Sequence, residues 1–210
     1  MARKTKQEAQ ETRSSILDAA VRVFAVKGVG RASLDDIARE AGVTRGAIYW
    51  HFANKADLLN TLWDQVLQFY APLAQASEAP DEPDPLGKMK ELYLSFFSGM
   101  VEDQRLQQLF RLLFDDSDRS KETVAIRHRH AQIRLERLQG LQATLDNAKQ
   151  KGQLPPDLDV RLGAISVLIF IYGLTANWIM TPDMFDIRNE GQQFIDGMIQ
   201  MLQISFQRRA

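Results

Sequence analysis

The 210-residue sequence predicts an all-α fold, in which a small N-terminal domain of three helices containing a helix-turn-helix precedes a larger helical domain. Three observations favour this class. Apolar residues recur at helical spacing, capping residues stand where helices should begin, and no segment past residue 55 reads as a strand. We expect residues 1–55 to form the small domain and residues 56–210 the larger one, near the common domain size of about 150 residues.

Residues 33–55 show two short helices joined by a tight turn. Ser33 and Asp36 make the serine-x-x-acid pattern of a capping box, which begins the first helix. Gly42 ends this helix, because glycine readily takes the left-handed conformation that turns the chain. Thr44 then caps a second helix. This layout is typical of the helix-turn-helix that reads DNA.

The second short helix has two unlike sides. Ala47, Ile48 and Phe52 point inward, so the start of the helix and its opposite side face outward, where a recognition helix meets bases and phosphates. Asn54 is expected to cap the next helix, with Asp57 as its reciprocal partner. A preceding amphipathic helix completes a three-helix core through Ile16, Leu17, Ala20, Val23 and Phe24.

Charge is unevenly divided along the chain. Residues 1–55 carry ten Lys and Arg against six Asp and Glu, a formal charge of +4, whereas the whole chain carries −1. The basic end is therefore the candidate polyanion-binding end. Charge alone also fits an ordinary solvated surface, but its coincidence with a capped helix-turn-helix favours DNA binding.

Several pieces of the N-terminal segment resemble a known family. They are TKQEAQETR, ILDAA, SLDDIAREAGVTRGAIYWHF and NKADLL, and they cover roughly the first 65 residues. This segment strongly resembles the TetR family of one-component bacterial repressors, and within it the AcrR-type branch that controls multidrug efflux pumps. Beyond it, the likeness rests on length, helical character and the pieces DPLG, GQLP and NW.

The resemblance implies a function and its partners. It implies a homodimeric transcriptional repressor that binds double-stranded operator DNA and is released from it by small hydrophobic or amphipathic inducers. Residues 1–55 would then be the DNA-binding domain and residues 56–210 the ligand-binding and dimerisation domain. The resemblance implies neither a cofactor nor a metal. An activator, or a repressor that answers a metabolite rather than drugs, would use the same DNA-facing residues and stays open.

The family pattern also assigns roles to residues around the recognition helix. Arginine pairs bidentately with guanine, glycine lets backbone approach the base edges, and tyrosine, histidine and lysine supply phosphate donors. Other interpretations stay open, since the threonine can act only as a cap, the tyrosine can only pack, and a lone histidine is often structural. Trp50 is left out of the set for this reason. The expected DNA-binding residues are Ser33, Thr44, Arg45, Gly46, Tyr49, His51 and Lys55.

Helical spacing continues past the helix-turn-helix. A fourth helix should run from the first domain into the second and end before the proline- and acid-rich residues 78–85. Its displacement would move the recognition helix, and two recognition helices must lie about 34–36 Å apart to enter successive major grooves. We therefore expect inducer to favour a dimer with the wrong spacing. Further helices are expected at 86–102, 104–115, 121–151, 158–180 and 188–207.

An aromatic group on the fifth and sixth expected helices, joined by residues of the eighth, is the candidate ligand pocket. A plain hydrophobic core is the alternative for each residue taken singly. At 115–118 the chain carries an acidic run where relatives in the branch often have a polar His-Lys-Cys-Glu-like run, so their ligand preferences do not transfer. The expected ligand-binding residues are Met89, Tyr93, Phe96, Phe110, Leu113, Phe114, Leu168, Ile171 and Tyr172.

The last expected helix carries a broad apolar stripe, and the eighth is apolar nearly all round. Together they resemble the family's four-helix dimer interface, in which each subunit supplies two helices. A helix pair in the core of a monomer is the alternative. The expected interface residues are Phe194, Ile195, Met198, Ile199, Leu202 and Phe206.

Composition excludes several other classes. The chain has no cysteine, which excludes disulfides and thiolate metal sites. The N-terminus lacks an apolar leader, and the longest apolar stretch, at 164–174, is too short to span a bilayer, so we expect a cytoplasmic protein that does not contact membranes. An enzyme or metal sensor is disfavoured because His128 and His130 point about 200° apart on a helix, and no phosphate loop or nucleophile elbow is present.

Overall fold

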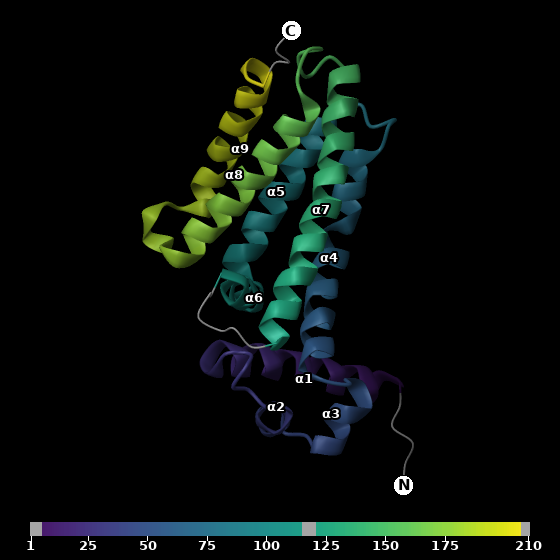
Figure 1. Ribbon diagram of the computed structural model, residues 1–210, viewed down its shortest axis with the longest axis vertical. Coiled ribbons are helices and arrows are strands. Elements are labelled where there is room, and N and C mark those ends of the chain that lie inside the picture. The colour runs from purple at the N-terminus through teal and green to yellow at the C-terminus, as the bar shows by residue number, and fades with distance from the viewer. Residues whose placement is uncertain (1–5, 115–120, 207–210) are drawn as a thin grey trace. The chain divides into compact units, whose positions relative to one another are not determined.

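The computed structural model describes residues 6–114 and 121–206 of the chain. In these two stretches the structure is helical and contains no strand, so the all-α prediction is confirmed (Figure 1). The acidic run at 115–118 lies outside the described residues. The elements are α1 (Lys6–Lys27), α2 (Leu34–Glu40), α3 (Arg45–His51), α4 (Lys55–Glu78), α5 (Pro85–Glu102), α6 (Gln104–Phe114), α7 (Lys121–Gln150), α8 (Val160–Met180), the 3-10 turn η1 (Pro182–Met184) and α9 (Ile187–Ile204).

The helices pack into two compact units. The N-terminal unit takes the chain through Val66 and also includes Gln104–Arg129, whereas the C-terminal unit takes Leu67–Asp103 and the chain from His130 onward. Thus α4 and α7 each contribute to both units, and α6 belongs with the first. The units are therefore not two consecutive segments, and the functional boundary at residues 55 and 56 stays a prediction.

The N-terminal unit has its own hydrophobic core. Phe24 of α1, Ile37 of α2 and Ile48 of α3 are fully buried in it, so the expected three-helix core is present. Helix α6 adds buried leucines to the same core, and Trp63 of α4 meets Phe110 of α6 edge to face, with ring centroids 5.1 Å apart. Sequence spacing predicted α6 as a helix but not that it covers this core.

The C-terminal unit is built on α5, α8 and α9 together with the remaining parts of α4 and α7. Helices α5 and α9 pack closely because Gly191 presents no side chain: a Cβ there would stand 2.9 Å from the ring of Phe97. Asn147 of α7 donates to the backbone oxygens of Glu78 and Ala79, which satisfies carbonyl groups at the C-terminus of α4.

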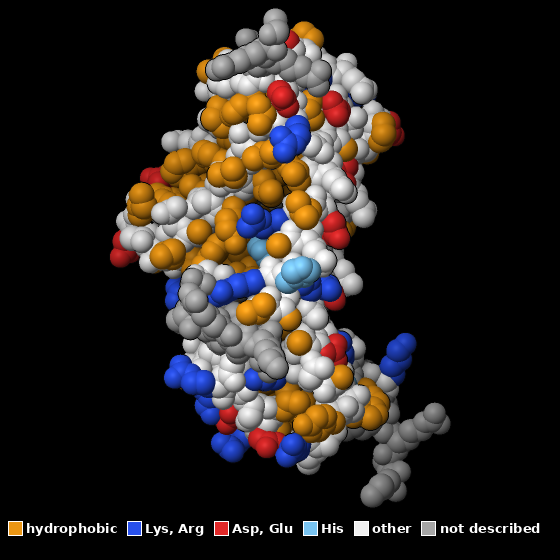
Figure 2. Space-filling view, viewed as in Figure 1, with side chains coloured by type: hydrophobic (Ala, Val, Ile, Leu, Met, Phe, Trp, Pro, Cys, Tyr) orange, Lys and Arg blue, Asp and Glu red, His pale blue; other side chains and the backbone are white. Residues whose placement is uncertain are grey.

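Helix α8 is the most apolar element of this unit. By length and composition alone Val160–Met180 qualifies as a possible membrane span, so the apolar segment is longer than the stretch at 164–174 indicated. However, a core or interface helix meets the same criterion. Only 28% of the tested window is buried inside the chain, which leaves much of its apolar surface uncovered. Figure 1 places α8 and α9 side by side, and hydrophobic side chains gather over them in Figure 2.

Candidate nucleic-acid interface

The start of α2 is held by a complete capping box, as predicted. The Ser33 hydroxyl accepts from the Asp36 backbone N–H at 3.1 Å, and the Asp36 carboxylate accepts from the Ser33 N–H at 3.1 Å. Lys27, in the last turn of α1, donates to the other carboxylate oxygen at 2.6 Å. The hydrogen bond from Lys27, followed by those from Ser33, holds the pKa of Asp36 far below its usual range. Ser33 therefore has a structural task in the free protein.

The turn between α2 and α3 has the geometry of a Schellman motif. The N–H of Gly42 donates to the carbonyl of Arg39 at 3.3 Å, and the N–H of Val43 donates to that of Ala38 at 3.0 Å. Gly42 has a φ of +66°, in the left-handed region. A Cβ at this position would meet nothing within 4 Å, so backbone conformation rather than space calls for glycine.

Helix α3 begins at the predicted cap and exposes the predicted side. The Thr44 hydroxyl accepts from the Ala47 N–H at 3.2 Å, while Arg45 and Gly46 are exposed. Ile48 and Phe52 are fully buried, which confirms the expected inward side. On the outer side, Tyr49 is 49% exposed and Trp50 71% exposed. Trp50, which sequence reasoning set aside, is thus part of the exposed surface, and its alternative as a packing residue is disfavoured.

Arg45 is oriented by neighbours on α2 and α3. Its Nε forms an ion pair with Asp35 at 3.2 Å, and its Nη2 donates to the Tyr49 hydroxyl at 3.3 Å. The guanidinium carbon also lies 5.5 Å from the centroid of the Tyr49 ring. The hydrogen bond to Tyr49 and the charge of Asp35 raise the pKa of Arg45 further, so it is fully cationic at any physiological pH.

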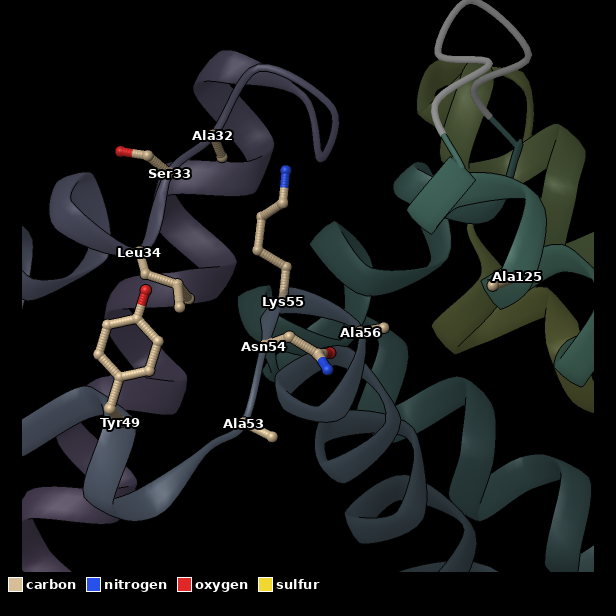
Figure 3. A pocket seen from close by; sticks show the side chains of 9 residues that line it. All are labelled: Ala32, Ser33, Leu34, Tyr49, Ala53, Asn54, Lys55, Ala56 and Ala125. Carbon is tan, nitrogen blue, oxygen red and sulfur yellow. The ribbon is translucent and has the colours of Figure 1, made fainter.

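Lys55 stands at the start of α4 and reaches back to the loop after α1. Its Nζ donates to the carbonyl of Val29 at 2.9 Å and to that of Gly30 at 3.3 Å. It lines a hollow of about 620 Å³ together with Ser33, Tyr49 and Asn54, and Figure 3 shows its side chain extending toward the segment at Ala32 and Ser33. The free protein therefore uses Lys55 to fix a turn, and its phosphate contact stays a prediction.

Two further details concern the segment that follows α3. His51 is partly buried and stacks edge to face with Trp50, with ring centroids 4.4 Å apart. Asn54 caps α4 as expected by accepting from the Asp57 N–H at 2.9 Å. The return bond differs from expectation, because the Asp57 carboxylate accepts from the N–H of Ala53, at 2.9 Å, rather than from that of Asn54.

The expected ligand-binding residues are divided between the two units. In the C-terminal unit, Met89, Tyr93 and Ile171 are buried, and burial raises the pKa of Tyr93 to about 12. Phe96 and Leu168 are partly buried against the same core, and Tyr172 is also partly buried. In the N-terminal unit, Leu113 is buried and Phe110 and Phe114 are partly buried, with the rings of these two phenylalanines 6.4 Å apart. The ligand-binding role of these residues stays a prediction.

Tyr172 has two polar neighbours, His130 and Arg134, that were not predicted from the sequence. The rings of His130 and Tyr172 lie 5.9 Å apart, and the guanidinium of Arg134 lies 5.0 Å from the Tyr172 ring centroid. Burial, and secondarily the charge of Arg134, lowers the pKa of His130 to about 4. His130 is therefore neutral at physiological pH. Helical spacing from 130 to 134 could have indicated that these two residues share one face of α7.

The expected dimer residues fall into two groups. Ile195, Met198 and Leu202 have at most 1% of their surface exposed inside a single chain, so they offer no area to a second copy. Phe194, Ile199 and Phe206 are partly exposed. Large apolar side chains are left exposed on several helices of the C-terminal unit. On α8 and just after it they are Leu162, Ile169, Met180 and Met184, and elsewhere they are Phe69 of α4, Leu135 of α7 and Ile204 of α9.

Within the described residues, no group of three or more His, Asp or Glu side chains is arranged to hold a metal ion. An N-terminal unit with a capped helix-turn-helix, an exposed helix start and an outward-facing arginine is the structure of a DNA-binding transcriptional regulator. Its family follows from comparison with known proteins.

The chain belongs to the TetR family. The family model described as "Bacterial regulatory proteins, tetR family" matches residues 16–62. The model described as "MAATS-type transcriptional repressor, C-terminal region" matches residues 84–204. Together they cover the helix-turn-helix and most of the chain behind it, so the resemblance noted for the N-terminal segment extends to the C-terminal unit.

Curated relatives and solved structures match along nearly the whole chain. The probable HTH-type transcriptional regulator ArpR of Pseudomonas putida is 41% identical over 205 residues, covering 98% of each chain. The HTH-type transcriptional regulator TtgR of Pseudomonas putida is 40% identical with the same coverage. The crystal structure of NalD, the secondary repressor of the MexAB-OprM multidrug efflux pump in Pseudomonas aeruginosa, is 28% identical, covers 95% of this chain and 100% of its own, and has a TM-score of 0.80.

Proposed function

We propose that this protein is a cytoplasmic, homodimeric repressor of multidrug efflux genes that small hydrophobic or amphipathic inducers release from its operator. The observation that carries the proposal is the exposed start of α3. Thr44 caps this helix, Arg45 and Gly46 are exposed, and Ile48 on the opposite side is fully buried. Similarity to NalD, which represses an efflux pump, supports the choice of target genes. A regulator of this kind needs no catalytic residue.

In the proposed complex, α3 enters the major groove and its first residues meet base edges. Arg45 donates to guanine O6 and N7, and Gly46 lets the backbone approach, since no side chain projects there. Tyr49, His51 and Lys55 contact phosphates, and Ser33 and Thr44 add donors beside their capping roles. We add Trp50 to this surface because it is 71% exposed on the same helix.

A repressor with two recognition helices must be a dimer. We propose that this dimer forms through the exposed apolar side chains of α8, together with the partly exposed residues of α9. Much of α8 remains uncovered in the single chain although its mean hydropathy is 1.8. An apolar surface of this kind is stabilised by a second copy that removes it from water. The interface is therefore shifted from the buried α9 residues toward Leu162, Ile169 and Met180.

Inducer binding is proposed to act through the helices that both units share. Helices α4 and α7 continue from one unit into the other, so a ligand that displaces their C-terminal-unit portions also displaces the N-terminal unit. Recognition helices in a dimer must stay about 34–36 Å apart, and a small tilt abolishes simultaneous insertion. Inducer weakens DNA binding only to the extent that it prefers the displaced state.

The experiment has two stages. A panel of neutral and cationic amphipathic drugs is first tested for binding to the purified dimer by calorimetry. Compounds that bind are then titrated against the complex of the dimer with its own upstream intergenic DNA, followed by fluorescence anisotropy. We expect binding compounds to raise the Kd for DNA. Compounds that bind but leave this Kd unchanged would contradict the inducer mechanism.

A further inference from the structure

Arg45, the residue placed to read a base, is held from two sides before DNA arrives. Asp35, the second residue of α2, forms the ion pair at its Nε, at 3.2 Å. Tyr49, one turn further along α3, accepts from its Nη2 at 3.3 Å and offers its ring as a surface for the guanidinium. An exposed arginine normally samples many rotamers, so two partners on different helices restrict its direction.

The two contacts leave other N–H donors of the guanidinium available to a base. Arginine has five N–H donors in a planar fork. Asp35 lies at the Nε edge and Tyr49 takes one hydrogen of Nη2, so both hydrogens of Nη1 and one of Nη2 remain. One hydrogen from each terminal nitrogen is the pair that guanine O6 and N7 accept in an end-on bidentate contact. The donors that remain are therefore sufficient for a bidentate contact with guanine.

Stability does not explain this ion pair. The side chains of Arg45 and Asp35 are 64% and 52% exposed, and ion pairs between such exposed groups contribute little to folding. The aspartate also competes with phosphates for the guanidinium, which weakens binding that depends on backbone contacts alone. Discrimination is favoured because the aspartate directs Arg45 toward one base and reduces its attraction to the backbone of other sequences.

We propose that Asp35 is a positioning residue for sequence recognition, which orients Arg45 for end-on reading of a guanine and limits its binding to non-cognate DNA. The proposal rests on the function proposed above. It adds a specificity determinant from α2, the helix that packs behind the recognition helix, to the residues expected to touch DNA.

The test uses the full-length dimer and a duplex that the wild type selects from a randomised DNA pool. Kd values are measured for this duplex, for a version changed at the base pair on which Arg45→Ala has its effect, and for a scrambled duplex. The proteins are the wild type, Asp35→Ala, Asp35→Glu, Arg45→Ala and the double variant Asp35→Ala/Arg45→Ala. Glu40→Ala is the matched control, because Glu40 is also an exposed acid of α2 but pairs with Arg22, at 2.7 Å.

We expect Asp35→Ala to lower discrimination at that base pair about 3- to 10-fold, part of what a bidentate contact supplies. Affinity for the scrambled duplex should stay level or rise. Asp35→Glu should restore part of the discrimination, Glu40→Ala should keep all of it, and Asp35→Ala should add no further loss when Arg45 is absent. Thermal unfolding of each variant measures how much stability is lost when an acidic residue is removed from the first turn of α2.

Two results would overturn the proposal. One is equal weakening of binding to all three duplexes, which would assign Asp35 a purely structural role in α2. The other is wild-type discrimination in Asp35→Ala. A wild-type dimer that enriches no sequence from the pool would instead contradict the proposed function itself, so failure of the two ideas is distinguishable.

Discussion

The protein exposes two surfaces of opposite character. Around the start of α3 the exposed side chains are polar or amphipathic, and their partners are close by: Arg45 meets Asp35 and Tyr49, and Lys55 meets backbone carbonyls. On α8 the exposed side chains are aliphatic, with Ile169 66% and Met180 73% exposed. The first surface is organised before any partner binds, whereas the second has apolar area that no other described residue covers.

This difference shows how each surface would gain its partner. A preorganised polar surface gains specificity, because its groups are already directed at the positions where bases and phosphates lie. An uncovered apolar surface gains affinity from area removed from water, with little directional preference. We therefore expect substitutions on α8 to change assembly and substitutions on α2 to α4 to change DNA recognition, and the following predictions test that division.

The largest effect is expected from Ile169→Asp, which places a charge in the middle of the proposed dimer surface. Burying an unpaired carboxylate is costly, so dimer dissociation should become at least about 100-fold easier. Light scattering or analytical ultracentrifugation over a concentration series measures it. Val26→Asp is the control, because Val26 is 83% exposed but lies on α1. Equal behaviour of the two variants would place the interface elsewhere.

Arg45→Ala should lower operator affinity by about 1–3 kcal/mol and relax preference at one base pair. Binding assays over single-base variants of a selected duplex measure both effects. Arg39→Ala removes the same charge from an 80% exposed side chain of α2 and should weaken binding evenly across sequences. If Arg45→Ala also weakens binding evenly, Arg45 contacts only the DNA backbone.

Gly42→Ala should destabilise the N-terminal unit by about 1–2 kcal/mol, because alanine disfavours the left-handed φ of +66°. Chemical denaturation measures this change. Gly46→Ala is the matched control: it lies in the first turn of α3, and its Cβ would meet nothing closer than 3.9 Å, so it should leave stability equal or higher. Gly46→Ala should instead impair DNA binding, where close backbone approach is expected. A Gly42→Ala variant as stable as the wild type would remove backbone strain as the reason for this glycine.

The smallest effect separates the two roles of Lys55. Loss of its bonds to Val29 and Gly30 in Lys55→Ala should lower stability by about 1 kcal/mol. If the lysine also meets a phosphate, the slope of log affinity against log salt should flatten by about one unit. Denaturation and a salt series report these quantities independently. Lower stability with an unchanged slope would restrict Lys55 to holding the turn.

Features specified by neighbouring residues were predictable from the sequence. The caps at Ser33 and Thr44, the left-handed Gly42 and the ends of α4 each depend on side chains within a few positions, and the structure agrees with them. Helical spacing and the Thr44 cap predicted the exposure of Arg45 and Tyr49 on α3 but not that of Trp50. Helix caps of this kind are predictable because they depend on hydrogen bonds between residues a few positions apart.

Features that depend on distant residues were not predictable in this way. Lys55 donates to carbonyl groups about 25 positions earlier in the chain. Asp35 pairs with Arg45 across the turn between α2 and α3, and helical spacing does not predict the geometry of that turn. The apolar stripe of α9 indicated a buried face but not what covers it. Inside the chain α5 and α8 both pack against α9, and Ile195 and Leu202 are fully buried, so they offer no area to an interface.

The most direct test of the central claim is selection of DNA by the wild-type protein from a randomised duplex pool at low salt. The account predicts enrichment of two related half-sites whose centres lie one or more helical turns apart, about 10–10.5 base pairs each, with a guanine whose preference disappears in Arg45→Ala. Enrichment of no sequence, or of one that Arg45→Ala selects equally well, would contradict it.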